Sequence, residues 1–355
     1  MSLAADARTD VVRACLREPT SRTPVWFMRQ AGRALPEYRA ARGAGSILSA
    51  FADAALSAEL TLQPVRRYGV DAAILFSDIV VPLHAIGFGV DVEQGRGPVV
   101  AEPFRSEADL VRLRPFEPAT DAPYVAETVG LVRRELEGSG VALIGFAGAP
   151  FTVASYAIEG APSRTFAKVK SLMHGNPDLW QQLTSRLAAM AVASLRAQIQ
   201  AGAQAVQLFD SWAGSLSPDE YARFALPSTR AVLEGIADLG VPTILFGVGT
   251  GELLALMGSA GSDVMGVDWR VPLDEARRRI GPGHSLQGNL DPALCLAPWP
   301  VVADACRSVL AAADRATDGS GTGHIFNLGH GVLPESDPGI LGAVVELVHA
   351  ETARA

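Results

Sequence analysis

Eight short apolar runs alternate with helical patterns along the chain, and this alternation restricts the possible folds more than any other feature of the sequence. Continuous apolar runs of this length are typical of strands covered on both faces, as in parallel sheets, although periodicity alone also allows short buried helices. The runs are PVWFM (24–28), AAILF (72–76), VALIGF (141–146), AVQLF (205–209), PTILF (242–246), VMGVD (264–268), SLQGN (285–289) and HIFNL (324–328).

The segments between these runs carry the start and stop signals of helices. Residues 176–202 begin with Asn176 and Pro177 and end at Gly202, and a second helical segment begins with Ser217 and Pro218. Asparagine or serine before proline is typical of a helix N-terminus, and glycine often follows the last helical residue. Eight alternations therefore predict an α/β chain folded as one (β/α)8 TIM barrel, with a doubly wound parallel sheet as the alternative.

Two segments depart from this repeat. The stretch GFGVDVEQGRGPVVAEPF (87–104) predicts a hairpin inserted before a helix over 120–137. Residues 1–20 are expected to form an N-terminal extension with a helix, and residues 21–352 the barrel domain. Because no long polar linker interrupts the chain, we expect a single domain.

Charge and cysteine usage exclude several classes of protein. The net charge of −8 argues against general binding to nucleic acid or to anionic membranes, and no apolar stretch approaches the length of a membrane span. The N-terminal residues also lack the pattern of a signal peptide. Cys15, Cys295 and Cys306 form no CxxC pair and are odd in number, which favours a reduced, cytoplasmic location.

The residue types at the strand ends narrow the chemistry further. Lys168 and Lys170 are the two lysines of the chain and neither follows a strand, so a Schiff-base mechanism is not expected. No histidine lies two residues from a cysteine, so no metal site is predicted. The glycine-rich stretch 247–251 lacks the spacing of a dinucleotide-binding loop and is interpreted as a turn.

Catalytic side chains of barrel enzymes lie at the carboxyl ends of the strands, so the residues that follow each apolar run are the site candidates. They are acidic, amide, hydroxyl and arginine side chains. The candidates are Arg29, Asp78, the loop 147–152, Asp210, Ser211, Asp268, Gln287, Asn289 and His330.

The stretch MRQAGR places Arg29 and Arg33 on a short loop that ends at the helix-starting Pro36. Arginine is permanently charged and binds carboxylates with two parallel hydrogen bonds, so the pair could form a carboxylate receptor. The same residues could equally form structural salt bridges, for example to Glu37. Asp78, at the end of the second apolar run, could be a site carboxylate or a helix cap.

Seven stretches together resemble the uroporphyrinogen decarboxylase family, in the same order and from about residue 21 to residue 350. The first and third resemble that family's two signature motifs. They are PVWFMRQAGRALPEYR, FSDIVVPLHAIG, IGFAGAPFTVASYAIEG, QLFDSWAG, VMGVDW, LQGNLDP and NLGHGVLPESDP. The resemblance implies a cofactor-free, cytoplasmic, homodimeric barrel enzyme of haem biosynthesis. Such an enzyme removes CO2 from the four acetate arms of uroporphyrinogen III and gives coproporphyrinogen III.

The resemblance also implies roles for individual residues. The substrate-binding loop corresponds to Arg29, Gln30, Ala31, Gly32 and Arg33. Asp78 corresponds to the essential aspartate that accepts the pyrrole N–H groups at the centre of the macrocycle. Further substrate contacts correspond to Tyr156, Ser211 and His330. Catalytic roles are expected for Asp78, Arg29, Arg33, Tyr156 and His330.

One departure and one open role accompany this assignment. Trp212 stands where some members of the family have histidine, but Ser211 beside it is kept. The family resemblance also brings the proposal that one of the two arginines, most often the one matching Arg29, donates a proton. Arginine stays protonated in proteins, which makes that demanding, and we hypothesise that Arg29 and Arg33 mainly anchor carboxylates.

Two other functions compete with this one. Corrinoid-dependent methyltransferases are similar in fold and distantly in sequence, but they carry zinc on a His-x-Cys pair, whereas Val332 follows His330 here. A non-catalytic tetrapyrrole carrier would bind the same ligand without releasing CO2.

Overall fold

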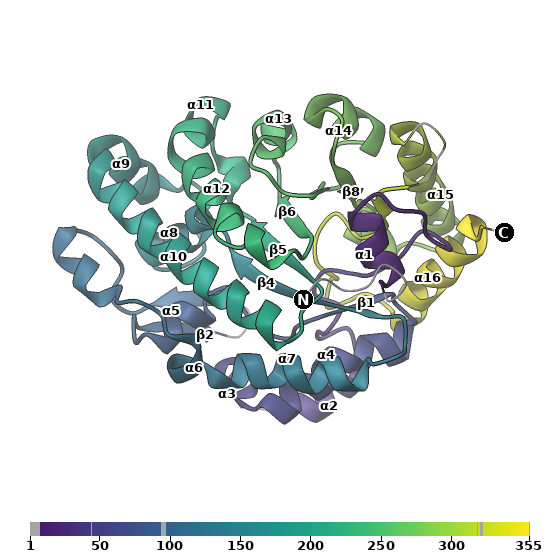
Figure 1. Ribbon diagram of the computed structural model, residues 1–355, viewed down its shortest axis with the longest axis horizontal. Helices are drawn as coiled ribbons and strands as arrows, with labels where there is room; N and C mark the ends of the chain where they lie inside the picture. The colour runs from purple at the N-terminus through teal and green to yellow at the C-terminus, as the bar shows by residue number, and fades with distance from the viewer. Residues whose placement is uncertain (1–7, 44, 94–96, 318, 320–321, 355) are drawn as a thin grey trace.

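The computed structural model describes residues 8–43, 45–93, 97–317, 319 and 322–354, and within them a parallel sheet curls through the centre of the molecule (Figure 1). Each strand pairs with the next one in the order β1-β4-β5-β6-β7-β8-β9, always in parallel. The strands are β1 (Ala72–Ile74), β4 (Ala142–Gly148), β5 (Ala205–Asp210), β6 (Thr243–Gly247), β7 (Val264–Gly266), β8 (Ser285–Gln287) and β9 (His324–Ile325).

Residues 24–28 close this sheet into a barrel. Val25 forms a parallel bridge with Phe326, directly after β9. On the other side of the segment, the N–H of Asp71, directly before β1, donates to the carbonyl of Val25 at 2.7 Å. The segment therefore lies between the last and the first strand and takes the eighth strand position. The predicted (β/α)8 barrel is confirmed, and the doubly wound alternative is wrong.

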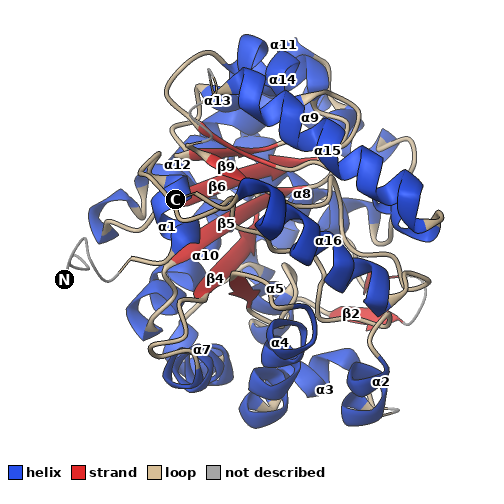
Figure 2. Cartoon of the chain, turned by 90° about the vertical axis from the view of Figure 1, so that its right-hand side faces the viewer, coloured by secondary structure: helices blue, strands red, loops and turns tan. Residues whose placement is uncertain are grey.

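Helices surround the barrel and connect consecutive strands (Figure 2). Proline lies at the start of many of them, as the sequence patterns predicted. The helices are α1 (Asp10–Cys15), α2 (Pro36–Arg42), α3 (Ile47–Ala52), α4 (Ala54–Tyr68), α5 (Val81–Ala85), α6 (Pro118–Asp121), α7 (Pro123–Glu135), α8 (Pro150–Glu159), α9 (Ala167–Gly175), α10 (Pro177–Ala201), α11 (Pro218–Glu220), α12 (Leu226–Glu234), α13 (Leu254–Gly258), α14 (Leu273–Ile280), α15 (Trp299–Ala316) and α16 (Pro338–Thr352).

Several predicted boundaries differ from the observed ones. The helix predicted over 120–137 is divided into α6 and α7, because Pro123 starts a new helix and cannot continue the preceding one. The predicted strands at 72, 264, 285 and 324 are shorter by two or three residues at their carboxyl ends, where the chain turns into the loops of the candidate site. The hairpin is confirmed as the antiparallel pair β2 (Val90–Glu93) and β3 (Gly97–Val100); its residues 94–96 lie outside the described part.

Helix α1 packs against the barrel on the side where the strands begin. Its Val11 and Val12 are fully buried in the main core, and the hydroxyl of Ser285, the first residue of β8, donates to the carbonyl of Ala14 at 2.7 Å. Residues 1–7 of the predicted extension lie outside the described part. Among the described residues, no helix combines the length and apolar character that crossing a membrane requires.

Asp71 holds the point where the barrel closes. Its buried carboxylate accepts hydrogen bonds from the Val25 N–H at 2.7 Å, from Arg22 at 2.9 Å and from His349 of α16 at 2.6 Å. Burial alone would raise the pKa of Asp71, but the bonds from His349, Val25 and Arg22 outweigh burial and hold that pKa below its usual range. The carboxylate therefore joins the first segment, β1 and the C-terminal helix.

We predict that Asp71→Ala lowers the free energy of unfolding by roughly 3–5 kcal/mol, because it leaves a buried N–H, the Arg22 guanidinium and the His349 ring without an acceptor. A carboxylate with a lowered pKa stabilises the fold above its ordinary pKa near 4, and this contribution is lost as the pH falls through the folded value. Urea unfolding should show a larger difference between variant and wild type at pH 7 than at pH 3. Asp314→Ala, on the exposed face of α15, is the matched control; equal unfolding of both variants at pH 7 would contradict the prediction.

Candidate active site

The two arginines of the MRQAGR loop lie at the mouth of the barrel, where residues 24–28 end. Arg29 and Arg33 are both exposed, and within the described part of the chain neither lies within ion-pair distance of a carboxylate. Glu37, the predicted structural partner, instead faces Arg67 at 3.9 Å. Arg29 adopts a left-handed backbone conformation with φ of 57°, which costs a non-glycine residue about 1–2 kcal/mol. Such strain is often found at functional sites.

The residues between the two arginines build the turn. Gln30 is buried, its side-chain oxygen accepts the Phe27 N–H at 3.0 Å, and its amide donates to the carbonyl of Ala72 at 3.0 Å. Its side chain therefore points into the barrel wall and not toward the mouth. At Gly32, a Cβ atom would lie 3.1 Å from the Arg29 carbonyl, so the turn is tight there.

Asp78 follows β1 and lies half-buried in the loop before α5. One carboxylate oxygen accepts the Val80 N–H at 3.0 Å and stabilises a local turn. Helix α5 itself begins without a side-chain cap, so Asp78 does not serve as the helix cap that the sequence left as an alternative. Burial raises the pKa of the Asp78 carboxyl, against the opposing effects of the Val80 N–H and of the Arg29 charge. The Asp78 carboxylate is therefore a poorly solvated anion that faces a cation.

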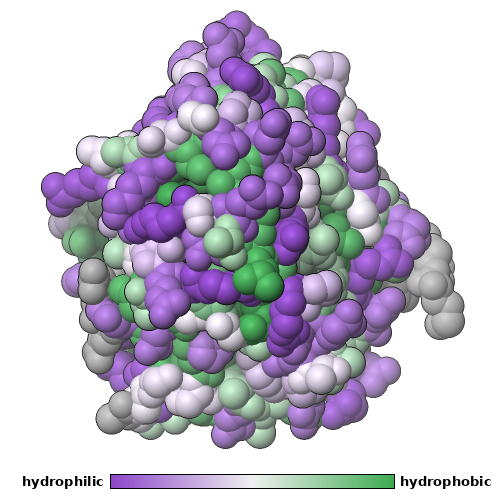
Figure 3. All heavy atoms as spheres, turned by 90° about the vertical axis from the view of Figure 1, so that its left-hand side faces the viewer, coloured by the Kyte–Doolittle hydropathy of each residue, from purple (hydrophilic) through white to green (hydrophobic). Residues whose placement is uncertain are grey.

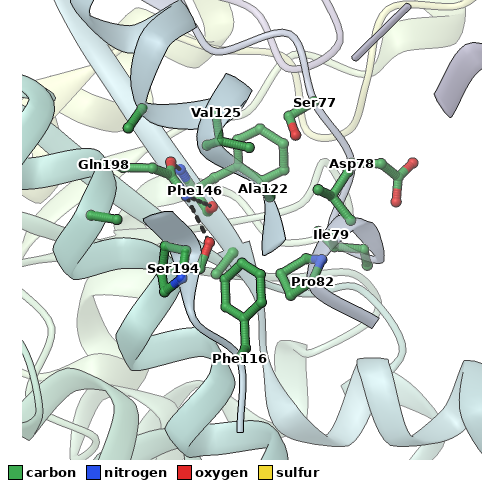
Figure 4. Close-up of a pocket in the computed structure, with 15 residues that line it drawn as sticks. Ser77, Asp78, Ile79, Pro82, Phe116, Ala122, Val125, Phe146, Ser194 and Gln198 are labelled. Atoms are coloured by element: carbon green, nitrogen blue, oxygen red, sulfur yellow. Dashed lines mark hydrogen bonds between the residues drawn. The ribbon is translucent and has the colours of Figure 1, made fainter. Parts of the chain in front are cut away.

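A narrow pocket lies behind Asp78, between α5, α7, α10 and β4. Figure 4 shows the Asp78 carboxylate pointing away from the pocket residues Phe116, Val125 and Gln198. The pocket volume of about 20 Å³ is enough for a water molecule and too small for an organic ligand. We therefore assign the carboxylate to the mouth of the barrel and not to this pocket.

Tyr156 reaches the site from α8 and packs against Trp212 from the loop after β5. The two rings meet edge to face with centroids 5.7 Å apart, and the Phe166 ring also packs on Trp212, with centroids 5.3 Å apart. Burial, and next the negative charge of Asp78, raise the pKa of Tyr156, so its hydroxyl is a neutral donor near Asp78. Ser211, directly before Trp212, is half-buried at the same strand end.

His330 follows β9 and is a neutral ring at physiological pH. Burial, and next the positive charge of Arg29, lower its pKa to about 4. Its Nδ1 accepts the Gly331 N–H at 2.6 Å, which places the ring proton on Nε2 and makes that nitrogen a donor. The Arg29 charge thus acts on Asp78, Tyr156 and His330 alike, and the structure brings these four predicted residues together.

Asp210, at the end of β5, lies behind the Trp212 loop. One of its oxygens accepts the Thr152 hydroxyl at 2.7 Å, and that hydroxyl accepts the Trp212 N–H at 3.1 Å. The other oxygen is buried without a hydrogen-bond partner among the described residues, and burial raises the pKa of Asp210 to about 6. Near neutral pH the fold therefore carries a buried anion next to the site.

This anion predicts a measurable pH dependence of stability. A carboxyl whose pKa is raised by folding favours the folded state below its ordinary pKa near 4, and this contribution is lost as the pH rises through about 6. Between pH 4 and pH 7, the wild type should lose about 3 kcal/mol of its free energy of unfolding through Asp210. Asp210→Asn should not show this loss. Urea titrations of the variant, the wild type and the control Asp314→Asn test this; parallel pH profiles for all three proteins would contradict it.

Three phenylalanines, Phe146, Phe209 and Phe246, lie at or near the carboxyl ends of β4, β5 and β6 and pack on one another; we call this cluster the apolar floor. The Gln287 amide of β8 donates to Gln207 of β5 at 2.9 Å, and because these strands are not neighbours the contact crosses the barrel interior. Phe209 lies two residues after Gln207 and therefore faces the same interior. It packs edge to face on Phe146 at 5.5 Å and on Phe246 at 6.0 Å.

The surface agrees with this arrangement of apolar and polar residues. Figure 3 views the molecule from the side of α9 and α5, where the strands end, and shows hydrophobic side chains in the middle of that face with hydrophilic ones around them. This floor was not predicted from the sequence, although three successive runs end in phenylalanine: VALIGF, AVQLF and PTILF. Among the described residues, no three His, Cys, Asp or Glu side chains are grouped so that they could hold a metal ion.

The fold and the site define a (β/α)8-barrel enzyme whose mouth combines an aromatic floor, a partly buried carboxylate and free arginines. Residues 6–351 match the family model described as uroporphyrinogen decarboxylase (URO-D). Similar curated proteins are named uroporphyrinogen decarboxylase, in Salinispora tropica with 58% identity and in Streptomyces griseus with 57%. The alignments cover 98% and 97% of this chain and 92% of each relative. The chain belongs to the uroporphyrinogen decarboxylase family.

Solved structures support the fold. A methyltransferase from Methanosarcina mazei superposes with a TM-score of 0.77 over 97% of this chain and 99% of that one, with 19% identity. A B12-independent methionine synthase from Shewanella sp. W3-18-1 superposes with a TM-score of 0.55 and 15% identity, over 86% of this chain and 89% of that one. At these identities the likeness shows a shared barrel and does not extend to the reaction.

Proposed function

We propose that this chain decarboxylates the four acetate side chains of uroporphyrinogen III and releases coproporphyrinogen III and four CO2, in haem and porphyrin biosynthesis and without a cofactor. The observation that carries the proposal is the charge of the exposed Arg29 next to the half-buried Asp78 at the barrel mouth, with a second exposed arginine, Arg33, on the same loop. The substrate carries eight carboxylates and four pyrrole N–H groups. A protein with a net charge of −8 needs a local cationic site to bind such a polyanion.

We propose that the Asp78 carboxylate lies at the centre of the bound macrocycle. Its carboxylate accepts the pyrrole N–H groups and lies against the ring while positive charge develops there. Because the carboxylate is fixed by the Val80 N–H before the reaction, its stabilising effect grows as the charge appears and so lowers the barrier. The phenylalanine floor supports the pyrrole rings and limits the access of water, which strengthens this interaction.

The reaction at each acetate balances as follows. A proton adds to a ring carbon next to the acetate-bearing carbon, and the pyrrole becomes a cation that can accept electrons. The bond between the acetate methylene and its carboxylate then breaks, CO2 leaves, and the electron pair neutralises the ring. The methylene carbon takes up a proton to become methyl, and the ring carbon gives its added proton back. One proton is consumed for each CO2 released.

The remaining predicted residues supply donors and anchors. Tyr156 and His330 are neutral donors at physiological pH, and with Ser211 they can hold carboxylates or pass protons through water. Arg29 and Arg33 bind substrate carboxylates before and during the reaction. Residues Gln30, Ala31 and Gly32 form the turn that sets their spacing.

Incubation of the purified protein with uroporphyrinogen III under anaerobic conditions tests the function. Release of CO2 together with products of seven to four carboxylates is the expected result. Tight binding without CO2 would indicate a carrier, and stoichiometric zinc with methyl transfer to a thiol would indicate a methyltransferase.

The family resemblance also supports three further assignments within this proposal. The protein is a homodimer, it is cytoplasmic, and residues 21–352 form the catalytic domain behind an extension of residues 1–20. Sedimentation equilibrium and cell fractionation test the first two. Deletion of residues 1–20 tests the third: an active product supports the division, and the loss of the core contacts of Val11 and Val12 should lower its stability.

A further inference from the structure

We propose that Arg270 is a third arginine of the substrate site and binds a peripheral carboxylate of the porphyrinogen. This inference rests on the proposed function, because it assigns a further contact to the same polyanionic substrate. Arg270 lies in the loop after β7, at the carboxyl end of the strand, where barrel enzymes carry their substrate contacts.

The loop after β7 and the loop after β9 lie in direct contact. A Cβ atom at Gly329 would come within 2.3 Å of the Trp269 backbone nitrogen, so only glycine allows the two chains to approach this closely. The Trp269 ring also faces the His330 ring at 6.5 Å, nearly edge to face. Arg270 is therefore next to the loop that carries His330.

The loop after β9 in turn contacts the arginine loop. A Cβ atom at Gly331 would lie 2.4 Å from Cδ of Arg29, so the Arg29 side chain runs directly across Gly331. Arg270, His330 and Arg29 thus follow one another around the rim of the barrel. In agreement with this order, the charges of both Arg29 and Arg270 contribute to the lowered pKa of His330.

Arg270 is held in a fixed position with part of its guanidinium free. Its Nη1 lies 2.6 Å from Asp268, and its guanidinium stacks on the Trp269 ring with Cζ 3.9 Å from the ring centroid. The side chain is nevertheless 50% exposed, and in the described part of the chain Nε and Nη2 have no hydrogen-bond partner. An arginine that is fixed on one side and open on the other loses little entropy when it binds a carboxylate.

Asp268 does not depend on Arg270 for its own solvation. The buried Asp268 carboxylate also accepts the N–H of Gly249 and, at 3.0 Å, the backbone N–H of Arg270. Replacement of the Arg270 side chain therefore leaves two donors on Asp268. The ion pair is not required to keep that carboxylate in place, so a substitution at Arg270 tests substrate binding more than folding.

The experiment compares Arg270→Gln, which keeps a donor and loses the charge, and Arg270→Lys, which keeps the charge. Arg278→Gln, on the outer helix α14 with a side chain 73% exposed, is the matched control. We expect Arg270→Gln to raise KM for uroporphyrinogen III about ten-fold, the loss of one charge-assisted hydrogen bond, with kcat within about two-fold. Arg270→Lys should restore part of the affinity, and the salt dependence of kcat/KM should weaken in the Gln variant alone.

Unchanged KM and salt dependence in Arg270→Gln would overturn the assignment. A fall of kcat as large as the rise of KM, together with a lower melting temperature, would also overturn it, because it would indicate a structural role. The two proposals fail separately. If the wild type binds the porphyrinogen without turnover, the proposed function fails, and the same variants still test Arg270 through their dissociation constants. If Arg270→Gln and Arg270→Lys bind the porphyrinogen as tightly as the wild type and the control Arg278→Gln do, Arg270 is not a substrate contact, whatever the reaction.

Discussion

Replacement of Asp78 by asparagine is expected to lower the turnover of uroporphyrinogen III by several orders of magnitude, ~10³-fold or more, while the protein still folds. Asparagine keeps the shape of the side chain and can still accept the Val80 N–H through its oxygen, so the loop before α5 is retained. What is lost is the negative charge beside the macrocycle. Because this charge interacts most strongly with the cationic intermediate, its removal should lower kcat far more than it raises KM.

Single-turnover kinetics and thermal unfolding together measure this effect. Asp314→Asn is the control for the loss of one carboxylate, since its side chain is exposed on the outer helix α15. The pH profile of the wild type adds an independent readout. Because burial raises the pKa of Asp78, the active anionic form should be lost on acidification at a higher pH than an ordinary aspartate would allow. Near-normal activity of Asp78→Asn would exclude the electrostatic role.

The common edge at which the strands of this chain finish could be predicted from the sequence, because parallel strands in a barrel all finish at the same edge, although four strands end two or three residues earlier than predicted. Arg29, Asp78 and His330 each follow an apolar run, and this position alone predicted that they would lie on one face of the molecule. In the structure, the charge of Arg29 acts on the pKa of both Asp78 and His330. Their collection at one site therefore follows from chain direction and requires no knowledge of side-chain packing.

Contacts between neighbouring loops could not be predicted in the same way. The sequence does not say that Gly331 lies against the Arg29 stem or that Gly329 lies against Trp269, because those contacts depend on how separate βα units stack around the barrel. Gln30 shows the same limit. It belongs to the loop that resembles the substrate-binding motif, yet its side chain joins residues 24–28 to β1 through hydrogen bonds with Phe27 and Ala72.

The inward direction of the phenylalanines also depends on tertiary structure. A run such as AVQLF is apolar at almost every position, so alternation gives no indication of which residues face the barrel interior. The contact of Gln207 with Gln287 across the barrel fixes that direction, and Phe209 follows from it. The apolar floor was therefore visible in the sequence only as repeated phenylalanine near the ends of three runs.

The simultaneous replacement of Arg29 and Arg33 by glutamine is expected to raise KM for uroporphyrinogen III by roughly 10²- to 10⁴-fold. Each arginine supplies charge-assisted hydrogen bonds worth about 1.5–3 kcal/mol, and the two effects multiply if the arginines bind different carboxylates. An anchoring role predicts that kcat at saturating substrate falls much less than kcat/KM. A role of Arg29 as proton donor predicts the reverse, a loss of kcat in Arg29→Gln alone.

The left-handed backbone of Arg29 provides a sharper version of the same experiment. Glycine adopts φ of 57° without strain, so Arg29→Gly should leave the free energy of unfolding unchanged or raise it by up to about 1 kcal/mol while substrate affinity falls. Arg17 has nearly the same conformation, with φ of 59°, and lies two residues after α1 at the opposite end of the barrel. Arg17→Gly therefore controls for the backbone effect, and Arg278→Gln controls for the loss of an exposed arginine. Weaker binding in Arg29→Gly without loss of stability, and in neither control, would show that the strained conformation is maintained for the ligand. Equal KM values in all these variants would show that the arginines do not hold the substrate.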